Sequence, residues 1–356
     1  MTRTITTSRP RSRIAREARE APSLTRAREE VWGIIGNAPV VKRLQRMVTA
    51  GPDAHAVLLS GTSGIGKAAL ATSLAQAFVC SNHTKENACG ACRNCVSFSH
   101  RRHPDLLSII DGDGVIDIEL MRGITASLQR RPTLSTRHVV LIDRIERMTE
   151  EASNAFLKTL EEPYGDTMFV LTTNSIHLVP HTIISRCSLF HCTQMPEDEI
   201  RKRLVAAGIA ATEARRIAAI ADGRPAYALR LARQRGAYDQ ALEDAGSLLA
   251  LIRAVPHERI RIAETIASHK EEPARMVAVL DRWESTVRRM LRIAAGLPDH
   301  GPGVEAIRSL VATTMTIPAI VRLAQQLRTM RDRIRTSGNI RLNIESFSLH
   351  LPTTRP

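Results

Sequence analysis

One stretch of the sequence constrains the fold more than any other: an apolar run, a glycine-rich loop and a helix-forming segment follow one another directly. The run AVLLS (56–60) leads into GTSGIGK (61–67), and AALATSLAQAF (68–78) follows. A G-x-x-x-x-G-K loop between a strand and a helix holds nucleotide phosphates with its backbone N–H groups and its lysine. The sequence therefore predicts a P-loop domain with a nucleotide site at Gly61, Gly64, Gly66 and Lys67.

Two positions that such a site needs for hydrolysis lack the usual chemistry. Position 68, which normally supplies a hydroxyl for Mg²⁺, is alanine. The second nucleotide element is an apolar strand that ends in an acid, here Asp143, and the next residue is Arg144. A guanidinium cannot act as a general base. Asp143 is expected either in a degenerate nucleotide site or, alternatively, as a cap of its strand or a partner of Lys67.

The alternation of apolar runs and amphipathic stretches predicts the fold class, α/β with a parallel sheet and helices on both faces. Further strands are expected at 105–111, 138–143, 168–173 and 188–192, and helices at 40–48, 68–78 and 150–162. Beyond Pro196, short helical segments separated by glycine give way to longer ones. We expect a disordered basic tail over 1–28, a P-loop domain over 29–193, a helical lid over 194–237 and an all-α domain over 238–356.

The charge balance favours contact with polyanions. Lys and Arg number 50 against 36 Asp and Glu, a formal net charge of +14. Such a charge suits nucleic acid or an acidic partner, although a solvated basic surface is the alternative. No stretch approaches 18 apolar residues in a row, so we expect no membrane span. The first 28 residues have no apolar core, which argues against a secretory signal and for a cytoplasmic protein, although an Arg- and Ser/Thr-rich leader also resembles an organelle transit peptide.

Four of the six cysteines form a cluster with the spacing of a metal site. Cys80, Cys89, Cys92 and Cys95 are arranged as C-x₈-C-x₂-C-x₂-C. Closely spaced thiolates of this kind converge on a tetrahedral Zn²⁺. A complete set of four ligands leaves no position open for a substrate, so the ion is expected to be structural. Four buried thiols without metal are the alternative.

Several further segments together carry a resemblance to a known family. They are WGIIGN (32–37), GTSGIGK, the cysteine cluster, ASNAFLKTLEEP (152–163), LTTNS (171–175), TIISRC (182–187), GRPAYALRLA (223–232) and NIRLNIESFSLHLP (339–352). With them, the chain resembles the AAA+ clamp-loader proteins of bacterial DNA polymerase III, and in particular the delta-prime subunits, from about residue 31 to 352. The resemblance implies an AAA+ domain with an inserted zinc module at 80–95, a lid and a helical collar that packs subunits into a ring.

The resemblance also implies roles for single residues. The arginine of TIISRC, Arg186, would act as an arginine finger in the ATP site of a neighbouring subunit; an ordinary surface salt bridge is the alternative. Thr173 and Asn174 fall in the sensor-1 region beside the γ-phosphate. The lid arginine of the motor subunits aligns with Ala226, with Arg224 close by. Together with Ala68 and Arg144, this departure leaves ATP binding in doubt.

The function implied is a delta-prime-like stator subunit without ATPase activity of its own, within the DNA-directed DNA polymerase III holoenzyme. Its partners would be the gamma/tau motor subunits and delta in a hetero-oligomer, and through the complex the sliding clamp and primed DNA. Two other interpretations remain open. One is a gamma/tau-type ATPase motor, and the other is a zinc-containing DNA-binding protein that acts independently of the loader.

Overall fold

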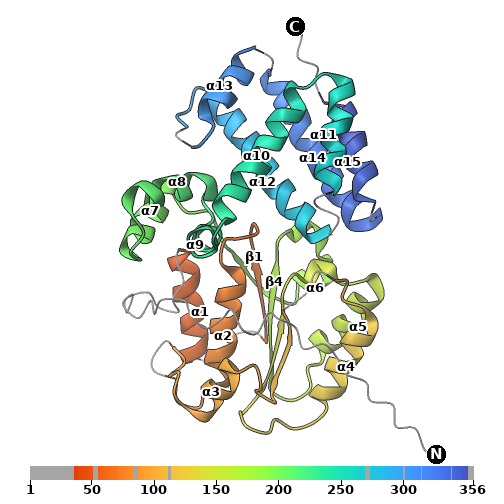
Figure 1. Cartoon of the computed structure of the whole chain (residues 1–356). Helices are drawn as coiled ribbons and strands as arrows, with labels where there is room; N and C mark the ends of the chain where they lie inside the picture. The colour runs from red at the N-terminus through yellow and green to blue at the C-terminus, as the bar shows by residue number, and fades with distance from the viewer. Residues whose placement is uncertain are drawn as a thin grey trace, which may run out of the picture.

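The computed structural model describes residues 36–50, 55–83, 87–110, 114–268, 273–299, 301–313, 315–337 and 339–351. The expected basic tail at 1–28 and most of WGIIGN lie outside these residues. Figure 1 shows a sheet flanked by helices in the lower part of the molecule, a group of short helices beside it and a larger helical cluster above.

Five parallel strands form one sheet in the order β2-β3-β4-β1-β5. The expected strands are confirmed, with ends that shift by one or two residues. They are β1 (Ala56–Ser60), β2 (Leu106–Ile109), β3 (His138–Ile142), β4 (Thr167–Thr173) and β5 (Ser188–His191). Because β4 lies between β1 and β3, the loops after these three strands meet at one end of the sheet.

Helices cover both faces of the sheet, as expected. Successive strand residues point to opposite faces, so Val57 and Leu59 of β1 enter one apolar cluster while Ala56 and Leu58 enter the other. The first cluster is covered by α1 (Ala38–Ala50), α2 (Lys67–Val79) and α3 (Arg93–Ser99), and the second by α4 (Ile118–Leu128), α5 (Glu150–Glu161) and α6 (His181–Ile184). The two layers lie on opposite sides of the strands in Figure 1. Two short 3₁₀ turns, η4 (Ile145–Arg147) and η5 (Ile176–Leu178), follow β3 and β4.

Three short helices make a separate small core after the sheet. They are α7 (Glu197–Ala206), α8 (Ala211–Ala221) and α9 (Pro225–Arg233). Ile200, Leu204, Ile217 and Leu231 are among its buried residues. These helices occupy the segment where the sequence predicts a lid.

The remaining helices share one larger core around Trp283, which is fully buried and stacks on Phe347 with ring centroids 5.6 Å apart. They are α10 (Ala237–Arg253), α11 (Pro256–Ser268), α12 (Pro273–Ala294), α13 (Val304–Thr313), α14 (Ile317–Ser337) and α15 (Ile340–Leu349). Helix α10 belongs to two cores, since its first turns pack in the lid cluster and its second half in the larger one.

No single helix in the described ranges is long and apolar enough to cross a membrane. The pair Val304–Thr313 and Ile317–Ile334 reaches the required length and composition only together, across a bend of 117°. Ile320, Leu323 and Leu327 from this pair are buried in the helical core.

Candidate functional site: a self-occupied P-loop

The glycine loop adopts backbone conformations that other residues rarely take. Gly64 and Gly66 have φ values of +81° and +109°, in the left-handed region that favours glycine. A Cβ at Gly61 would lie 2.6 Å from the carbonyl oxygen of Cys192, which follows β5. The glycines predicted from the pattern are therefore required by the fold of this loop, and α2 begins at Lys67, immediately after the loop.

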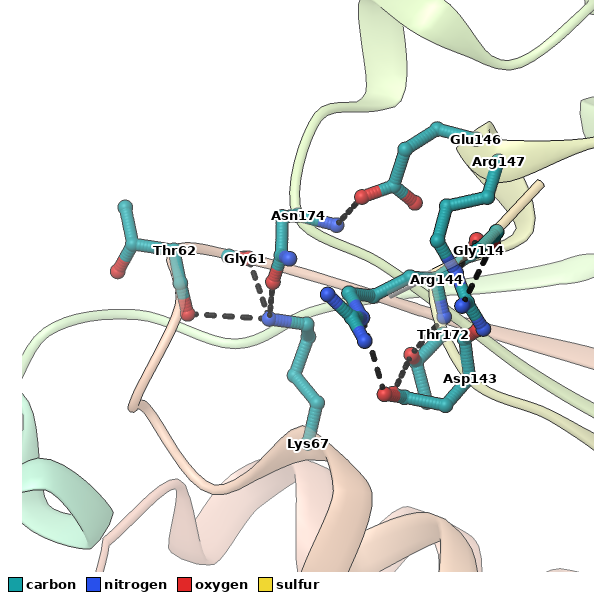
Figure 2. A network of polar contacts seen from close by, with 10 residues as sticks. All are labelled: Gly61, Thr62, Lys67, Gly114, Asp143, Arg144, Glu146, Arg147, Thr172 and Asn174. Atoms are coloured by element: carbon teal, nitrogen blue, oxygen red, sulfur yellow. Dashed lines mark hydrogen bonds and ion pairs between the residues drawn. The ribbon is translucent and has the colours of Figure 1, made fainter. Parts of the chain in front are cut away.

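The Lys67 ammonium group is buried and bonded to its own chain. Its Nζ donates to the carbonyl oxygens of Gly61 at 2.6 Å and Thr62 at 3.0 Å, and to Oδ1 of Asn174 at 2.8 Å (Figure 2). Burial lowers the pKa of Lys67 to about 8, although Glu146 and Asp143 act in the opposite direction. All three donor positions of the ammonium thus have acceptors within the protein, and phosphate oxygens would have to displace them.

The Asp143 carboxylate pairs with the adjacent Arg144 and not with Lys67. Its Oδ1 accepts a hydrogen bond of 2.5 Å from the Thr172 hydroxyl, and its Oδ2 lies 3.5 Å from Nε of Arg144. The Thr172 hydroxyl in turn accepts from the backbone N–H of Arg144 at 3.0 Å (Figure 2). The direct Asp143–Lys67 pair offered as an alternative is therefore not formed. The acid that would organise Mg²⁺ lies beside a guanidinium of the same chain.

The sensor-1 segment reaches the site through Thr172 and Asn174. Thr173 instead bonds within its own turn, where its hydroxyl donates to the carbonyl of Ser175 and accepts from the Ser175 N–H. The backbone N–H of Asn174 donates to Oε1 of Glu146 at 3.1 Å. No sequence pattern assigned a role to Glu146. The signal that could have found it is an acid three residues after Asp143, in a turn at the carboxyl end of a parallel strand.

Helix α9, in the segment predicted as a lid, packs on the glycine loop through Tyr227. The N–H of Tyr227 donates to the carbonyl oxygen of Gly64 at 2.9 Å, and a Cβ at Gly64 would lie 2.8 Å from the Tyr227 Cβ. The guanidinium groups of Arg224, Arg230 and Arg282 lie 4.6, 5.0 and 5.6 Å from the centre of the Tyr227 ring.

Arg224, the arginine close to the aligned lid position, is buried, and burial lowers its pKa. Ala226 has no group that could contact a phosphate. Helix α9 thus contacts the glycine loop through Tyr227 and a backbone hydrogen bond. The sequence motifs did not predict this contact.

Arg186 lies at the surface, next to the end of α5. Its Nη2 is 2.5 Å from Oε1 of Glu161, and its Nη1 donates to the carbonyl oxygen of Thr182 at 2.9 Å and to the Ser185 hydroxyl at 3.2 Å. Its partners, Glu161, Thr182 and Ser185, all lie outside the glycine loop. In the single chain, Arg186 therefore makes the local salt bridge considered as an alternative.

The four predicted cysteine ligands come together. All four sulfur atoms lie within 4.8 Å of one another, and the pairs Cys80–Cys89, Cys80–Cys92 and Cys89–Cys95 are 3.7, 3.9 and 4.0 Å apart. A tetrahedral ion with Zn–S bonds of about 2.3 Å has sulfur–sulfur edges of about 3.8 Å. Backbone N–H groups at residues 82, 89, 92 and 95 point to sulfur atoms at 3.3–3.4 Å. The cluster can hold a metal, and a tetrahedral one fits its dimensions.

Part of the chain is similar in sequence to known proteins. Residues 36–196 match the family model described as "DNA polymerase III, delta subunit". The delta-prime subunit of DNA polymerase III from Pseudomonas aeruginosa is 38% identical over 136 residues, covering 38% of this chain and 42% of that protein. The resemblance to the clamp-loader subunits of DNA polymerase III, delta-prime or a related one, is confirmed.

The relatives also include tau and gamma subunits of DNA polymerase III. The tau subunit from Salmonella typhimurium is 34% identical over 171 residues, covering 48% of this chain and 26% of that protein. The chain spans less than half the length of these relatives. Among solved structures, a DNA polymerase III gamma subunit-related protein from Thermotoga maritima is similar over 87% of this chain and 98% of that one, with 17% identity and a TM-score of 0.39.

Proposed function

We propose that this chain is a delta-prime-like stator of the DNA polymerase III clamp loader. It would complete a hetero-oligomeric ring with gamma/tau motor subunits and delta, in the cytoplasm, and would not hydrolyse ATP itself. The complex would use hydrolysis in the motor subunits to place the sliding clamp on primed DNA.

The ion pair between Asp143 and Arg144 carries this proposal. Phosphoryl transfer depends on a positioned metal, charge neutralisation and an oriented nucleophile. Here the acid of the second nucleotide element faces Arg144 at 3.5 Å, the adjacent base position is that arginine, and residue 68 has no hydroxyl. Lys67 is engaged by two carbonyls and an amide of its own chain. Each departure would lower turnover by orders of magnitude.

Arg186 is the residue that we propose acts on a partner. It extends from the turn after α6 and is bound by an exposed glutamate that a stronger anion could replace. A guanidinium placed on a γ-phosphate in trans accelerates hydrolysis by about 10³–10⁵. For the four-cysteine cluster we propose a structural Zn²⁺, because the sulfur–sulfur distances match its bond length and all four ligand positions are filled.

A gamma/tau-type motor is the second candidate, since a tau subunit is among the relatives. An ATPase assay on the purified chain with Mg²⁺ separates the two. We expect turnover at background, and we expect Ala68→Thr to leave it there because Arg144 remains. Turnover that depends on Mg²⁺ and is abolished by Lys67→Ala would establish a motor and overturn the stator.

A further inference from the structure

The layer of helices on one face of the sheet has a charge distribution that neither the P-loop nor the cysteine cluster requires. Between Gly36 and Pro104 the sequence has only two acids, Asp53 and Glu86, and neither lies among the described residues. The same region exposes Lys42, Arg43, Arg46, Arg93, Arg101 and Arg102. We call the surface formed by these six cations the basic face.

The basic face is one continuous layer of structure. Helix α2 contacts both α1 and α3, and all three bury side chains in the same apolar cluster on one face of the sheet. In Figure 1 they form the layer drawn in red to orange. Lys42, Arg43 and Arg46 share the outer side of α1, because residues three and four apart are neighbours on a helix. Arg43 is also held over the ring of Phe190, 4.8 Å from its centre.

The opposite face of the same sheet has a different balance. The helices α4 and α5 and their flanking turns expose four cations among acids, namely Arg122, Arg130, Arg131 and Lys158. The exposed acids there are Asp117, Glu119, Glu150, Glu151, Glu161 and Glu162. The excess of positive charge is thus concentrated on one side of the domain, and it is not an even consequence of the net charge of +14.

The basic face exposes few large apolar side chains, and this helps to distinguish a protein, a single strand and a duplex as its partner. Of the large hydrophobic side chains exposed in the described residues, only Val96 belongs to this layer, and the two phenylalanines of the layer, Phe78 and Phe98, are buried. Protein interfaces depend on buried aromatic or aliphatic anchors, and single-stranded nucleic acid is held by stacking on exposed aromatic rings. The described residues of this layer thus expose arginines and lysines but no acid and no Phe, Tyr or Trp ring, which suits the phosphates of a duplex.

We propose that the basic face binds the sugar–phosphate backbone of double-stranded DNA, without sequence preference. This site lies on the outer side of the P-loop sheet. It is additional to any DNA handling by an assembled clamp loader and does not depend on the stator function.

The test measures binding of the full-length chain to a short fluorescent DNA duplex of random sequence, over a range of salt concentrations. The variant Lys42→Gln/Arg43→Gln/Arg46→Gln removes three cations of the basic face. The matched control, Arg122→Gln/Arg130→Gln/Lys158→Gln, removes the same charge from the opposite face. We expect the first to weaken binding about tenfold and to lower the salt slope by about 2–3, because each lost phosphate contact removes about 0.9 from that slope. The control should change affinity less than about twofold.

A second variant replaces two cations of the basic face near the cysteine cluster, so that the test remains valid if the α1 substitutions disturb folding. Arg93→Gln/Arg102→Gln should lower the salt slope by about 2. Equal losses in the α1 variant and its control would overturn the proposal, as would unchanged binding in both basic-face variants or no duplex binding by the parent chain. Loss of binding to poly-glutamate with unchanged duplex binding would also overturn it, in favour of an acidic protein partner.

Discussion

At the scale of single residues, the glycine loop is marked by a lysine ammonium that is buried and bonded to the protein's own chain. Lys67 donates to two carbonyl oxygens and an amide oxygen, and burial holds its pKa at about 8, against 10.5 for an ordinary lysine. In the unfolded chain the amine regains its ordinary value. Between these two pKa values the unfolded chain therefore binds more protons than the folded one, and stability rises with pH across this window.

We predict this rise from the difference between the parent chain and Lys67→Met. Between pH 8 and 10.5, the parent should gain up to about 3 kcal/mol in free energy of unfolding relative to the variant. Denaturant titrations at several pH values measure the difference, and other titrating groups cancel in it. The exposed Lys158→Met serves as the control and should give a flat profile. Parallel curves for the parent and Lys67→Met would show that the ammonium is not desolvated.

The cysteine cluster gives a second prediction at this scale. The purified chain should contain about one zinc, and Cys92→Ser should lose most of it together with thermal stability, because metal binding contributes to folding. Cys187→Ser, a half-buried thiol outside the cluster, should keep the metal. Elemental analysis and thermal unfolding provide the two readouts. A folded preparation of the parent without metal would rule out the site.

The roles of site residues could be predicted from the sequence where they depend on a local motif, and not where they depend on partners far away in the sequence. Ala68 and Arg144 could be interpreted directly, because their positions are fixed relative to the loop and the strand. The partners of Lys67 could not, since Asn174 lies 107 positions away and reaches it only through strand pairing. The roles of Glu146 and Tyr227 could not be predicted for the same reason. Each contacts a residue that is distant in the sequence, Asn174 for Glu146 and Gly64 for Tyr227.

At the scale of elements, the strands were predictable because buried parallel strands are short apolar runs bounded by turn residues. The five runs in the sequence correspond to the five strands of the sheet. The docking of α9 on the glycine loop was not predictable. It depends on the absence of a side chain at Gly64, opposite the Cβ of Tyr227, and hydrophobic periodicity does not predict such a contact.

This docking leads to a prediction about Gly64. Gly64→Ala should destabilise the chain by about 1–3 kcal/mol more than Gly208→Ala, because the added methyl meets Tyr227 at 2.8 Å. Both glycines have left-handed backbones, at φ +81° and +90°, so the strain of the backbone is common to the two variants, and a Cβ at Gly208 meets nothing within 4 Å. Chemical denaturation compares them. Equal losses would mean that the lid does not rest on the loop in solution.

Arg259 joins the ends of three helices in the large cluster. Its buried guanidinium donates to the carbonyl oxygens of Ile252, Ala254 and Leu351 at 2.8–3.2 Å. Arg259→Met should lower the free energy of unfolding by about 3 kcal/mol, since it leaves buried carbonyls without donors. The exposed neighbour in the same helix, Arg261→Met, should change stability by less than about 0.5 kcal/mol. Similar small effects of both variants would show that water replaces the guanidinium.

At the scale of the whole molecule, Arg186 tests whether the chain works through a neighbour. In a reconstituted clamp-loader complex, Arg186→Ala should lower DNA-stimulated ATPase activity while the complex still assembles, and Arg186→Lys should do the same because an ammonium lacks the planar fork. Arg122→Ala is the control, because Arg122 pairs with Glu119 at the same 2.5 Å as Arg186 with Glu161. Lys67→Ala should have little effect. A reversed ranking of Arg186 and Lys67 would place the chemistry within this chain.

Helix α10 connects the core of α7–α9 to the large helical core, because its two halves pack in different clusters. Ala237, Tyr238 and Ala241 pack in the lid cluster, while Leu248 and Leu251 pack in the large helical one. A helix of 17 residues is about 25 Å long. A tilt of about ten degrees at its first turn would therefore move its last turn by about 4 Å. Because α10 packs in both clusters, a change in the way α9 rests on the glycine loop would therefore also shift the large helical cluster.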